Sequence, residues 1–598
     1  MKKKTLITLL VSGFLSVSGL KAQSIQEGKN NLYADRYKSA IGVFEKLLAT
    51  NPNNIEAIYW LGQTYLEMDE FAGARVANAR ALYEKGLQST ANAPLLLVGL
   101  GHVELRENKL NDARQHFETA LSMTRGRKGD DPAILSAVGR ANAEAKSGDY
   151  NYAIEKLVAA ADKGDKTPDI FLQLGNAYRK AKPGEGGGDA YKSYKKALEM
   201  DPNFAIADIR LAKLFESQKN WELFTEYLNS ATKRDPNFTP AYYELFYYHF
   251  FRAKFPEAEV QLKKYIESKL PEKDIQDEYL YAQLSWARKD FDGAIIKAEA
   301  VAAAMGTLTK PKVYRLLADA YYRKGDSLSK KGDSVTARAN FVNARKNSDE
   351  FFAKKNPDDI ILPDYETKAL ILSKLGGTPD EIYSTYMVGA SLDTTVEAKV
   401  AFLKKGADEF KSRGDSISRI KEGDLRLALI KLKTAPSQRD YFDAGFAYYQ
   451  GNAYTRADSL FEIIYVKYPD EPYGPQMRFT IARILDSTME KGAAVPFGLK
   501  YLEILEKDTA KNKKAILSTA GYLAQYYANI AKDKAKAIEY LKKMLVLNPE
   551  NADIKKNIEI LEKSPAAKPG TTRNGTKPAP VAKPKRVTTV KKTTVAKK

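Results

Sequence analysis

A recurring spacing of small and large apolar residues constrains the fold of this chain more than any other feature. One set is Gly101, Ala113, Phe117 and Ala120, with steps of 12, 4 and 3 residues. The same steps recur in Ala212/Phe224/Leu228/Ala231, Phe246/Ala258/Leu262/Tyr265, Ala282/Ala294/Ala298/Val301 and Gly445/Ala457/Phe461/Ile464. A period of about 34 residues is typical of stacked repeats, in which each unit packs mainly on its neighbours.

Two stretches carry a further signature at the start of a repeat. Residues 59–65 read YWLGQTY, and residues 171–178 read FLQLGNAY. With the spacing, they resemble the tetratricopeptide repeat family, and the resemblance covers most of 23–563. It implies an all-α fold, a right-handed superhelical solenoid of paired helices A and B, with helix A lining the concave face.

The spacing has a physical reason under this resemblance. Small residues let helices A and B approach closely, and larger apolar residues fill the seam between them. A proline then ends helix B, because it lacks the N–H that the helical ladder needs. Such stops are predicted at Asn51-Pro52, Asp201-Pro202, Asp235-Pro236 and Asn548-Pro549.

The pattern divides the chain into five segments. We expect a signal peptide at 1–22, a first solenoid at 23–346, and irregular helical hairpins at 347–436, where the repeat frame is lost. A second solenoid at 437–563 ends in a capping helix from Ala552 to Lys563. The remaining segment, 564–598, is rich in Lys, Pro and Thr, and its composition predicts disorder.

The N-terminus has the three parts of an export signal. Lys2–Lys4 are followed by an apolar run over 5–20, and Ala22 precedes the expected new N-terminus, Gln23. The alternative is an uncleaved anchor, but a membrane span needs about 20 residues. We therefore expect a periplasmic protein with no membrane span after cleavage, or else a secreted or envelope-associated one.

Basic charge is concentrated at the C-terminus. The chain has 95 Lys and Arg against 75 Asp and Glu, a net charge of +20. Residues 564–598 hold ten basic residues and no acidic one. This tail is expected either to contact an anionic surface, such as lipid head groups or cell-wall polymer, or only to keep the protein soluble. Nucleic acid is not expected as a partner of an exported chain.

Composition argues against catalysis and bound cofactors. The chain has no cysteine and three histidines, His102, His116 and His249. Thiolate and zinc chemistry are therefore unexpected, and hydrogen-bonded structural histidines are the favoured interpretation. We predict no enzyme, metal or cofactor; an active site within 347–436 is the alternative.

Aromatic residues gather at positions that the resemblance places on the concave face. They are Tyr243, Tyr247 and Phe250, then Tyr279 and Trp286 in the next repeat, and later Phe442, Phe446 and Tyr449. Such rings offer large contact area at low entropic cost and suit an extended peptide or a helix. The alternative is that they pack between repeats.

A polar set occupies equivalent positions in three earlier repeats. Arg140, Asn176 and Lys213 stand at the ninth position, and Arg179 lies a turn beyond Asn176. Such a groove could hold carboxylates through charge-assisted hydrogen bonds. The favoured interpretation is an ordinary solvated surface.

Asp-Ser and Asp-Thr pairs resemble an O-glycosylation acceptor motif of exported bacterial proteins. Each pair precedes an apolar residue, alanine or threonine. The candidate acceptors are Ser327, Ser334, Thr394, Ser416 and Ser487. The alternative is helix N-capping, in which these side chains accept from free backbone amides.

Together these features favour a non-catalytic binding protein. The main hypothesis is a periplasmic scaffold that binds protein segments in its concave groove and helps to assemble or organise a cell-envelope complex. The alternative is an adaptor for cell wall or glycan that uses the aromatic groove and the basic tail.

Overall fold

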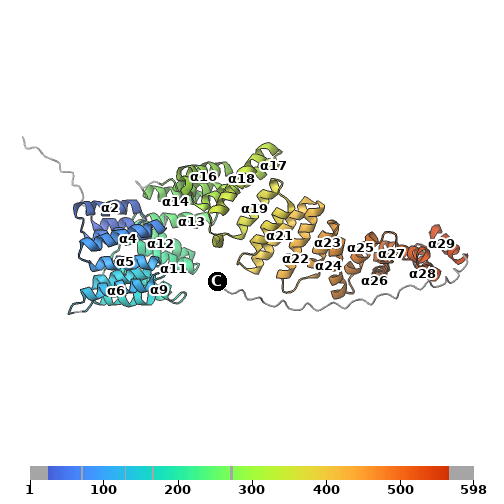
Figure 1. The fold of residues 1–598 in the computed structure, drawn as a ribbon, viewed down its shortest axis with the longest axis horizontal. Coiled ribbons are helices and arrows are strands. Elements are labelled where there is room, and N and C mark those ends of the chain that lie inside the picture. The colour runs from blue at the N-terminus through green and yellow to red at the C-terminus, as the bar shows by residue number, and fades with distance from the viewer. Residues whose placement is uncertain (1–23, 69–71, 128, 165–166, 270–273, 564–598) are drawn as a thin grey trace, which may run out of the picture. The chain divides into compact units, whose positions relative to one another are not determined.

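The computed structural model describes residues 24–68, 72–127, 129–164, 167–269 and 274–563. These residues form helices and connecting turns, and they contain no β-strand beyond an isolated bridge between Gly126 and Gly129. The chain divides into two compact units, one ending at Pro357 and one beginning at Asp358 (Figure 1). The predicted signal peptide and tail lie outside the described residues. The all-α solenoid fold is confirmed.

Consecutive helices of the first unit pair as antiparallel hairpins. Its α-helices are α1 (Ile25–Tyr33), α2 (Tyr37–Thr50), α3 (Ile55–Glu67), α4 (Ala72–Ser89), α5 (Pro94–Arg106), α6 (Leu110–Thr124), α7 (Pro132–Glu144), α8 (Tyr150–Asp162), α9 (Pro168–Ala181), α10 (Gly187–Met200), α11 (Ala205–Ser217), α12 (Trp221–Arg234), α13 (Thr239–Phe250), α14 (Phe255–Ser268), α15 (Asp277–Ala287), α16 (Phe291–Met305), α17 (Pro311–Lys330) and α18 (Ser334–Lys354). A short 3-10 turn, η1 (Gly306–Leu308), precedes α17.

The second unit continues the same construction. Its α-helices are α19 (Leu362–Lys374), α20 (Pro379–Ala390), α21 (Val396–Arg413), α22 (Ser416–Leu432), α23 (Gln438–Gln450), α24 (Tyr454–Lys467), α25 (Tyr473–Leu485), α26 (Val495–Leu505), α27 (Thr509–Asn529), α28 (Lys534–Leu547) and α29 (Ala552–Lys563). Two 3-10 turns are η2 (Pro357–Asp359), at the junction of the units, and η3 (Glu506–Asp508). The expected terminal helix is α29, which buries Ile554 and Ile558 and exposes its charged residues.

Several helical hairpins are held by an aromatic ring of helix B that fits against a glycine of helix A. A Cβ on Gly101 would lie 2.5 Å from Cε1 of Phe117, and the ring is buried. Gly175 meets Tyr194 in the same way, at 2.3 Å. Because ordinary carbon contacts need about 3.5 Å or more, only glycine permits these approaches.

The predicted helix stops form a recurring turn. Asn51, Asp201 and Asp235 are the C-cap residues of α2, α10 and α12, and each is followed by proline and asparagine. In each turn the cap side chain accepts a hydrogen bond from the backbone N–H two residues later, at 3.2, 2.9 and 2.9 Å. This Asx turn redirects the chain after proline has ended the helix.

The expected boundary at 346/347 falls inside α18, which continues to Lys354. The region 347–436 is also more regular than its sequence suggests. Gly389 faces the ring of Phe402, and Gly423 faces the ring of Tyr448 across neighbouring helices. The glycine–aromatic packing therefore persists there, at a changed spacing along the chain.

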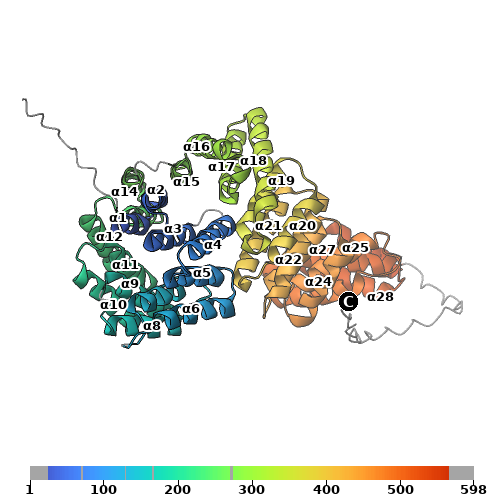
Figure 2. The same ribbon diagram turned by 60° about the vertical axis from the view of Figure 1, so that its left-hand side comes forward.

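The first unit curls until its first helix meets later repeats. The Tyr33 hydroxyl at the end of α1 hydrogen-bonds to Asp169 of α9, and its ring meets Phe204, before α11, edge-on at 5.6 Å. Arg36 Nη1 donates to the carbonyl of Asn237 at 3.2 Å. Figure 2 shows α1 beside α12. The inner surface of this unit therefore encloses a space.

Candidate functional site

An aromatic patch lies on α13 and the turn that follows it. The ring of Tyr243 is 37% exposed and meets Tyr247 at 5.0 Å. The Tyr247 hydroxyl donates to Gln283 Oε1 at 3.0 Å, and Phe250 is partly buried beside it. Phe251, which sequence reasoning missed, is 77% exposed and stacks on Tyr247 at 5.6 Å. The structure thus brings the three predicted residues together and adds a fourth.

The two aromatic residues predicted on α15 do not extend this patch. Tyr279 is buried, and its hydroxyl donates to the carbonyl of Lys312 at 3.4 Å. Trp286 is half-buried, and its Nε1 donates to Asp319 Oδ2 at 2.5 Å. The assignment to an open groove is wrong for Tyr279, which is buried, whereas for Trp286 it stays a prediction; both side chains hydrogen-bond to the next repeat.

A second aromatic row lies in the second unit, on α23. Phe442 and Phe446 are stacked with centroids 5.7 Å apart, and Phe446 and Tyr449 are stacked at 6.0 Å. The ring of Phe446 is 37% exposed. Tyr473, at the start of α25, is 47% exposed and meets Phe442 edge-on at 5.5 Å. This residue extends the predicted set across two repeats.

Arg140 is buried, so both the groove interpretation and the favoured solvated-surface interpretation are wrong for this residue. Its side chain is 4% exposed and makes ion pairs with Asp169 at 2.9 Å and Glu144 at 2.7 Å. It also donates to the hydroxyl of Tyr33 at 2.7 Å and lies 4.6 Å from the ring centroid of Trp60. The buried guanidinium group therefore contacts residues of α1, α3, α7 and α9 and holds these helices together.

The other members of the polar set face the inner surface but are partly engaged. Asn176 accepts from the Tyr194 hydroxyl and donates to Gln173 Oε1, both at 3.0 Å. Arg179 donates to the carbonyl of Lys213 at 3.5 Å. Lys213 itself pairs with Glu244 at 2.6 Å and Glu216 at 3.1 Å. Only Asn176 and Arg179 reach the cavity described next.

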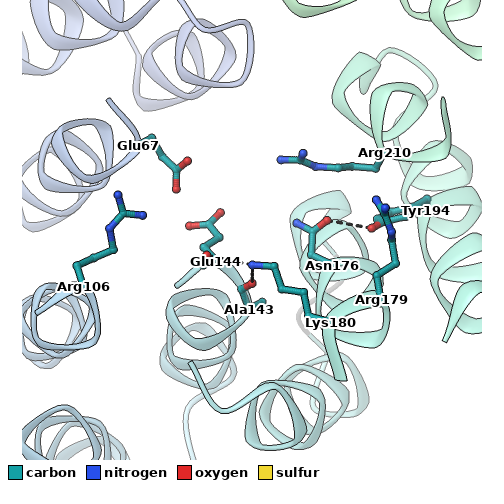
Figure 3. A pocket seen from close by; sticks show the side chains of 9 residues that line it. All are labelled: Glu67, Arg106, Ala143, Glu144, Asn176, Arg179, Lys180, Tyr194 and Arg210. Atoms are coloured by element: carbon teal, nitrogen blue, oxygen red, sulfur yellow. Dashed lines mark hydrogen bonds between the residues drawn. The ribbon is translucent and has the colours of Figure 1, made fainter. Parts of the chain in front are cut away.

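Inside the first unit is a cavity of about 340 Å³, the charged chamber (Figure 3). It is lined by Glu67, Arg106, Ala143, Glu144, Asn176, Arg179, Lys180, Tyr194 and Arg210. Four of these side chains are basic and two are acidic. The lining comes from five A helices and one B helix, so it exists only because the repeats curve around it.

Sequence reasoning missed most of the chamber, although a signal was present. Four lining residues stand five positions after the helix-A glycine of consecutive repeats: Glu67 after Gly62, Arg106 after Gly101, Glu144 after Gly139 and Lys180 after Gly175. The charge alternates along this ladder. Equivalent positions in stacked repeats lie side by side, so the ladder predicts neighbouring charges on one face.

Burial shifts the pKa of one carboxyl group in the chamber. Burial raises the pKa of Glu144 to about 8, although the neighbouring Arg140 favours the charged form. Its Oε1 is engaged by Arg140 and by Gln173 Nε2, both at 2.7 Å, whereas its Oε2 is buried without a hydrogen-bond partner. Burial therefore favours the protonated form of this carboxyl, and the contact with Arg140 opposes it.

Two of the three histidines, His102 and His116, hydrogen-bond to neighbouring side chains. His102 is buried, its Nδ1 hydrogen-bonds to Gln63 Oε1 at 2.9 Å, and burial lowers its pKa to about 3. His116 Nδ1 lies 2.8 Å from Glu104 Oε2. Within the described ranges no group of three or more His, Asp or Glu side chains is placed to bind a metal. No described helix has the length and apolar character needed to cross a membrane.

The five candidate glycosylation residues are all exposed. Ser334 and Ser416 begin helices whose N-caps are the preceding aspartates, Asp333 and Asp415, so capping explains those two motifs. Asp486, before Ser487, accepts from the N–H groups of Lys491 and Ala493. Ser327 lies within α17, and Thr394 lies in the turn before α21. The hydroxyls are accessible; their modification stays a prediction.

Comparisons with known proteins find one family model and several solved structures. A tetratricopeptide repeat model matches residues 31–77, and no curated protein matches the chain. The C-terminal part of a TPR repeat-containing protein from Cytophaga hutchinsonii is 23% identical, covering 47% of this chain and 99% of that one, with a TM-score of 0.26. A tetratricopeptide repeat protein from Parabacteroides merdae is 14% identical over 52% of this chain and 98% of that one, with a TM-score of 0.28. Yeast Tom70 is 15% identical, covering 82% of this chain and 97% of that one, with a TM-score of 0.29.

The matched segment spans the first hairpins, and the later ones repeat their construction. The same glycine–aromatic contact holds the first hairpin, where Gly28 meets Phe44, and the hairpin of Gly445 and Phe461 in the second unit. Residues 31–77 therefore match the tetratricopeptide repeat family, and the other described hairpins share their paired-helix construction.

Proposed function

We propose that this protein is a non-catalytic scaffold that binds segments of partner proteins and helps to organise a cell-envelope complex. The tetratricopeptide repeat fold suggests protein–protein interaction. The observation that carries the proposal is the pair of exposed aromatic surfaces, Tyr243/Tyr247/Phe251 on the first unit and Phe442/Phe446/Tyr473 on the second. Aromatic side chains dominate the energetics of protein interfaces, and exposed apolar patches mark interaction sites.

The geometry of each surface supports binding of a chain segment. The rings are fixed before a partner arrives, because each one packs on a neighbouring ring or hydrogen-bonds to the next repeat. A preformed surface loses little conformational entropy when a segment docks. The envelope location rests on the export pattern of residues 1–22, which lie outside the described residues.

The test is affinity capture from a cell-envelope extract of the source cells. Wild-type protein is compared with Tyr243→Ala/Phe251→Ala and with Phe446→Ala/Tyr473→Ala. The matched control is Val466→Ala, because Val466 is also an exposed apolar residue, at 69%. We expect a discrete protein that wild type and control retain and that at least one double variant loses. Capture of the same proteins by all four would refute the proposal.

Glycan binding is the second candidate, and one observation favours it. The Phe442 and Phe446 rings are nearly parallel, at 9°, and Phe446 is partly open to solvent. Such a platform suits stacking on a sugar ring as well as on a peptide. Sedimentation with purified cell wall, with and without residues 564–598, distinguishes the two candidates. Cosedimentation that Phe446→Ala abolishes would favour the glycan adaptor.

Export is tested separately by cell fractionation and mass spectrometry. We expect mature protein in the periplasmic fraction, beginning at Gln23. A chain that retains residues 1–22 in the cytoplasm would contradict this part of the proposal without affecting the binding surfaces.

A further inference from the structure

The charged chamber is separate from both aromatic surfaces and has its own binding chemistry. Its lining comes from α3, α5, α7, α9, α10 and α11. The closure of α1 onto α9 brings these helices around one space, and the buried Arg140–Asp169 ion pair holds that closure. A volume of about 340 Å³ lies within the range of small-molecule sites, about 300–1,000 Å³.

Several groups of the chamber are already committed to the protein. Lys180 Nζ donates to the carbonyls of Ala143 and Glu144, at 2.6 and 3.1 Å. Arg179 donates to the carbonyl of Lys213. Asn176 is engaged by Tyr194 and Gln173. These contacts hold the three side chains in place in the wall of the chamber.

Two arginines remain uncommitted. Among the described residues, the guanidinium groups of Arg106 and Arg210 have no ion-pair or hydrogen-bond partner; Arg106 is exposed, whereas Arg210 is half-buried and its Nε is a buried atom without a partner. Buried polar groups in native proteins nearly always have a partner, so Arg210 Nε is the atom that indicates a missing ligand, and Arg106 is a second cation open to the same space. Arg106 and Arg210 enter the chamber from opposite sides, with the Glu67 and Glu144 carboxyl groups between them in Figure 3.

This arrangement specifies a ligand. Guanidinium groups bind phosphate and carboxylate in bidentate fashion, so the two ends of the ligand should be anionic. The middle faces the acidic side chain of Glu67, which accepts hydrogen bonds from hydroxyl or amino groups. Glu144 Oε2 is a second buried atom of the chamber for which the protein supplies no hydrogen-bond partner.

We propose that the charged chamber binds a small molecule with an anionic group at each end, phosphate or carboxylate, held by Arg106 and Arg210, and with hydroxyl or amino groups between them. Binding at this site does not depend on partner capture by the aromatic surfaces.

Isothermal titration calorimetry of the full chain tests this proposal at fixed ionic strength. Fructose 1,6-bisphosphate probes the phosphate class, citrate probes the carboxylate class, and fructose is the neutral control. We expect at least one anionic probe to bind and fructose not to bind. Arg106→Gln and Arg210→Gln should each weaken binding roughly tenfold or more, since a charge-assisted hydrogen bond is lost.

The control variant is Arg345→Gln, which removes an exposed arginine of α18. It should bind as wild type does, and circular dichroism should show the same helix content for all variants. Failure of both anionic probes, or equal binding by Arg106→Gln, Arg210→Gln and wild type, would overturn the proposal. Binding of an acidic peptide in place of both small probes would also overturn it. Because the aromatic variants are not used, this result is independent of partner capture.

Discussion

The ring of Tyr83 in α4 packs against glycines of α3 and α5, so adding a single methyl group at Gly62 should strongly reduce stability. In Gly62→Ala the new Cβ would lie 2.2 Å from Cζ and 2.3 Å from Oη of Tyr83. The ring is fully buried and cannot move away freely, because a Cβ at Gly99 would already lie 2.6 Å from it. Its hydroxyl also donates to the carbonyl of Tyr59 and accepts from Gln63 Nε2, both at 2.9 Å.

The magnitude follows from these contacts. Overpacking a core costs about 1–3 kcal/mol, and losing the tyrosine hydrogen bonds adds about 1 kcal/mol each. Alanine recovers about 1 kcal/mol of helix propensity. We expect Gly62→Ala to destabilise α3–α5 by about 2–4 kcal/mol. Gly42→Ala in α2 is the matched control, because no heavy atom lies within 4 Å of its Cβ position, and it should stabilise α2 by about 0.5–1 kcal/mol.

Hydrogen exchange followed by mass spectrometry resolves the effect locally, which suits a chain whose repeats open independently. Peptides from α3 and α5 should exchange about 30- to 1,000-fold faster in Gly62→Ala, and peptides from α23 should not change. Adding Tyr83→Leu should restore part of the protection by removing the clash. Unchanged or slower exchange of α3 in Gly62→Ala would refute the packing argument.

Three further predictions concern the inner surface and the second aromatic row. Asp169→Ala should destabilise the contact of α1 with α9 by about 3–5 kcal/mol, because it removes one of the two ion-pair partners of the buried Arg140 and the hydrogen-bond partner of the Tyr33 hydroxyl; faster exchange of α1 would show this, and unchanged exchange would contradict it. The folded-state pKa of Glu144, about 8, exceeds the unfolded value of about 4.3, so wild-type stability should fall as pH rises between them. Urea unfolding should show that Glu144→Gln gains stability relative to wild type from pH 6 to pH 9, and a constant difference would refute the assignment. Phe446→Ala should cost less than about 1 kcal/mol, because its ring is 37% exposed; a larger loss in thermal unfolding would show that the ring is structural.

The sequence predicted the local construction because that construction is periodic. Gly101 and Phe117 touch at the predicted spacing, and the Asn51-Pro52 stop forms the predicted turn. In 347–436 the same glycine–aromatic packing occurs at a different spacing, because Gly389 and Phe402 lie only 13 positions apart and come from successive helices. The repeat spacing read from the sequence therefore does not predict this contact.

The candidate site was less predictable because it depends on curvature. Arg140 stands at a position that faces inward in one repeat, but the return of α1 buries it against Tyr33. No local pattern encodes a contact across 107 positions. The alternating ladder from Glu67 to Lys180 was visible as single positions, yet its meeting with Arg210 required the closed arrangement.

Photo-crosslinking in living cells tests the central claim, that the exposed aromatic rows bind partner segments. A photoreactive phenylalanine analogue replaces Phe446, Phe251 or, as an exposed apolar control, Val466. The account predicts a discrete crosslinked protein, identified by mass spectrometry, at Phe446 or Phe251 and its absence at Val466. Crosslinks of equal identity and yield at all three positions, or none at either ring, would contradict it.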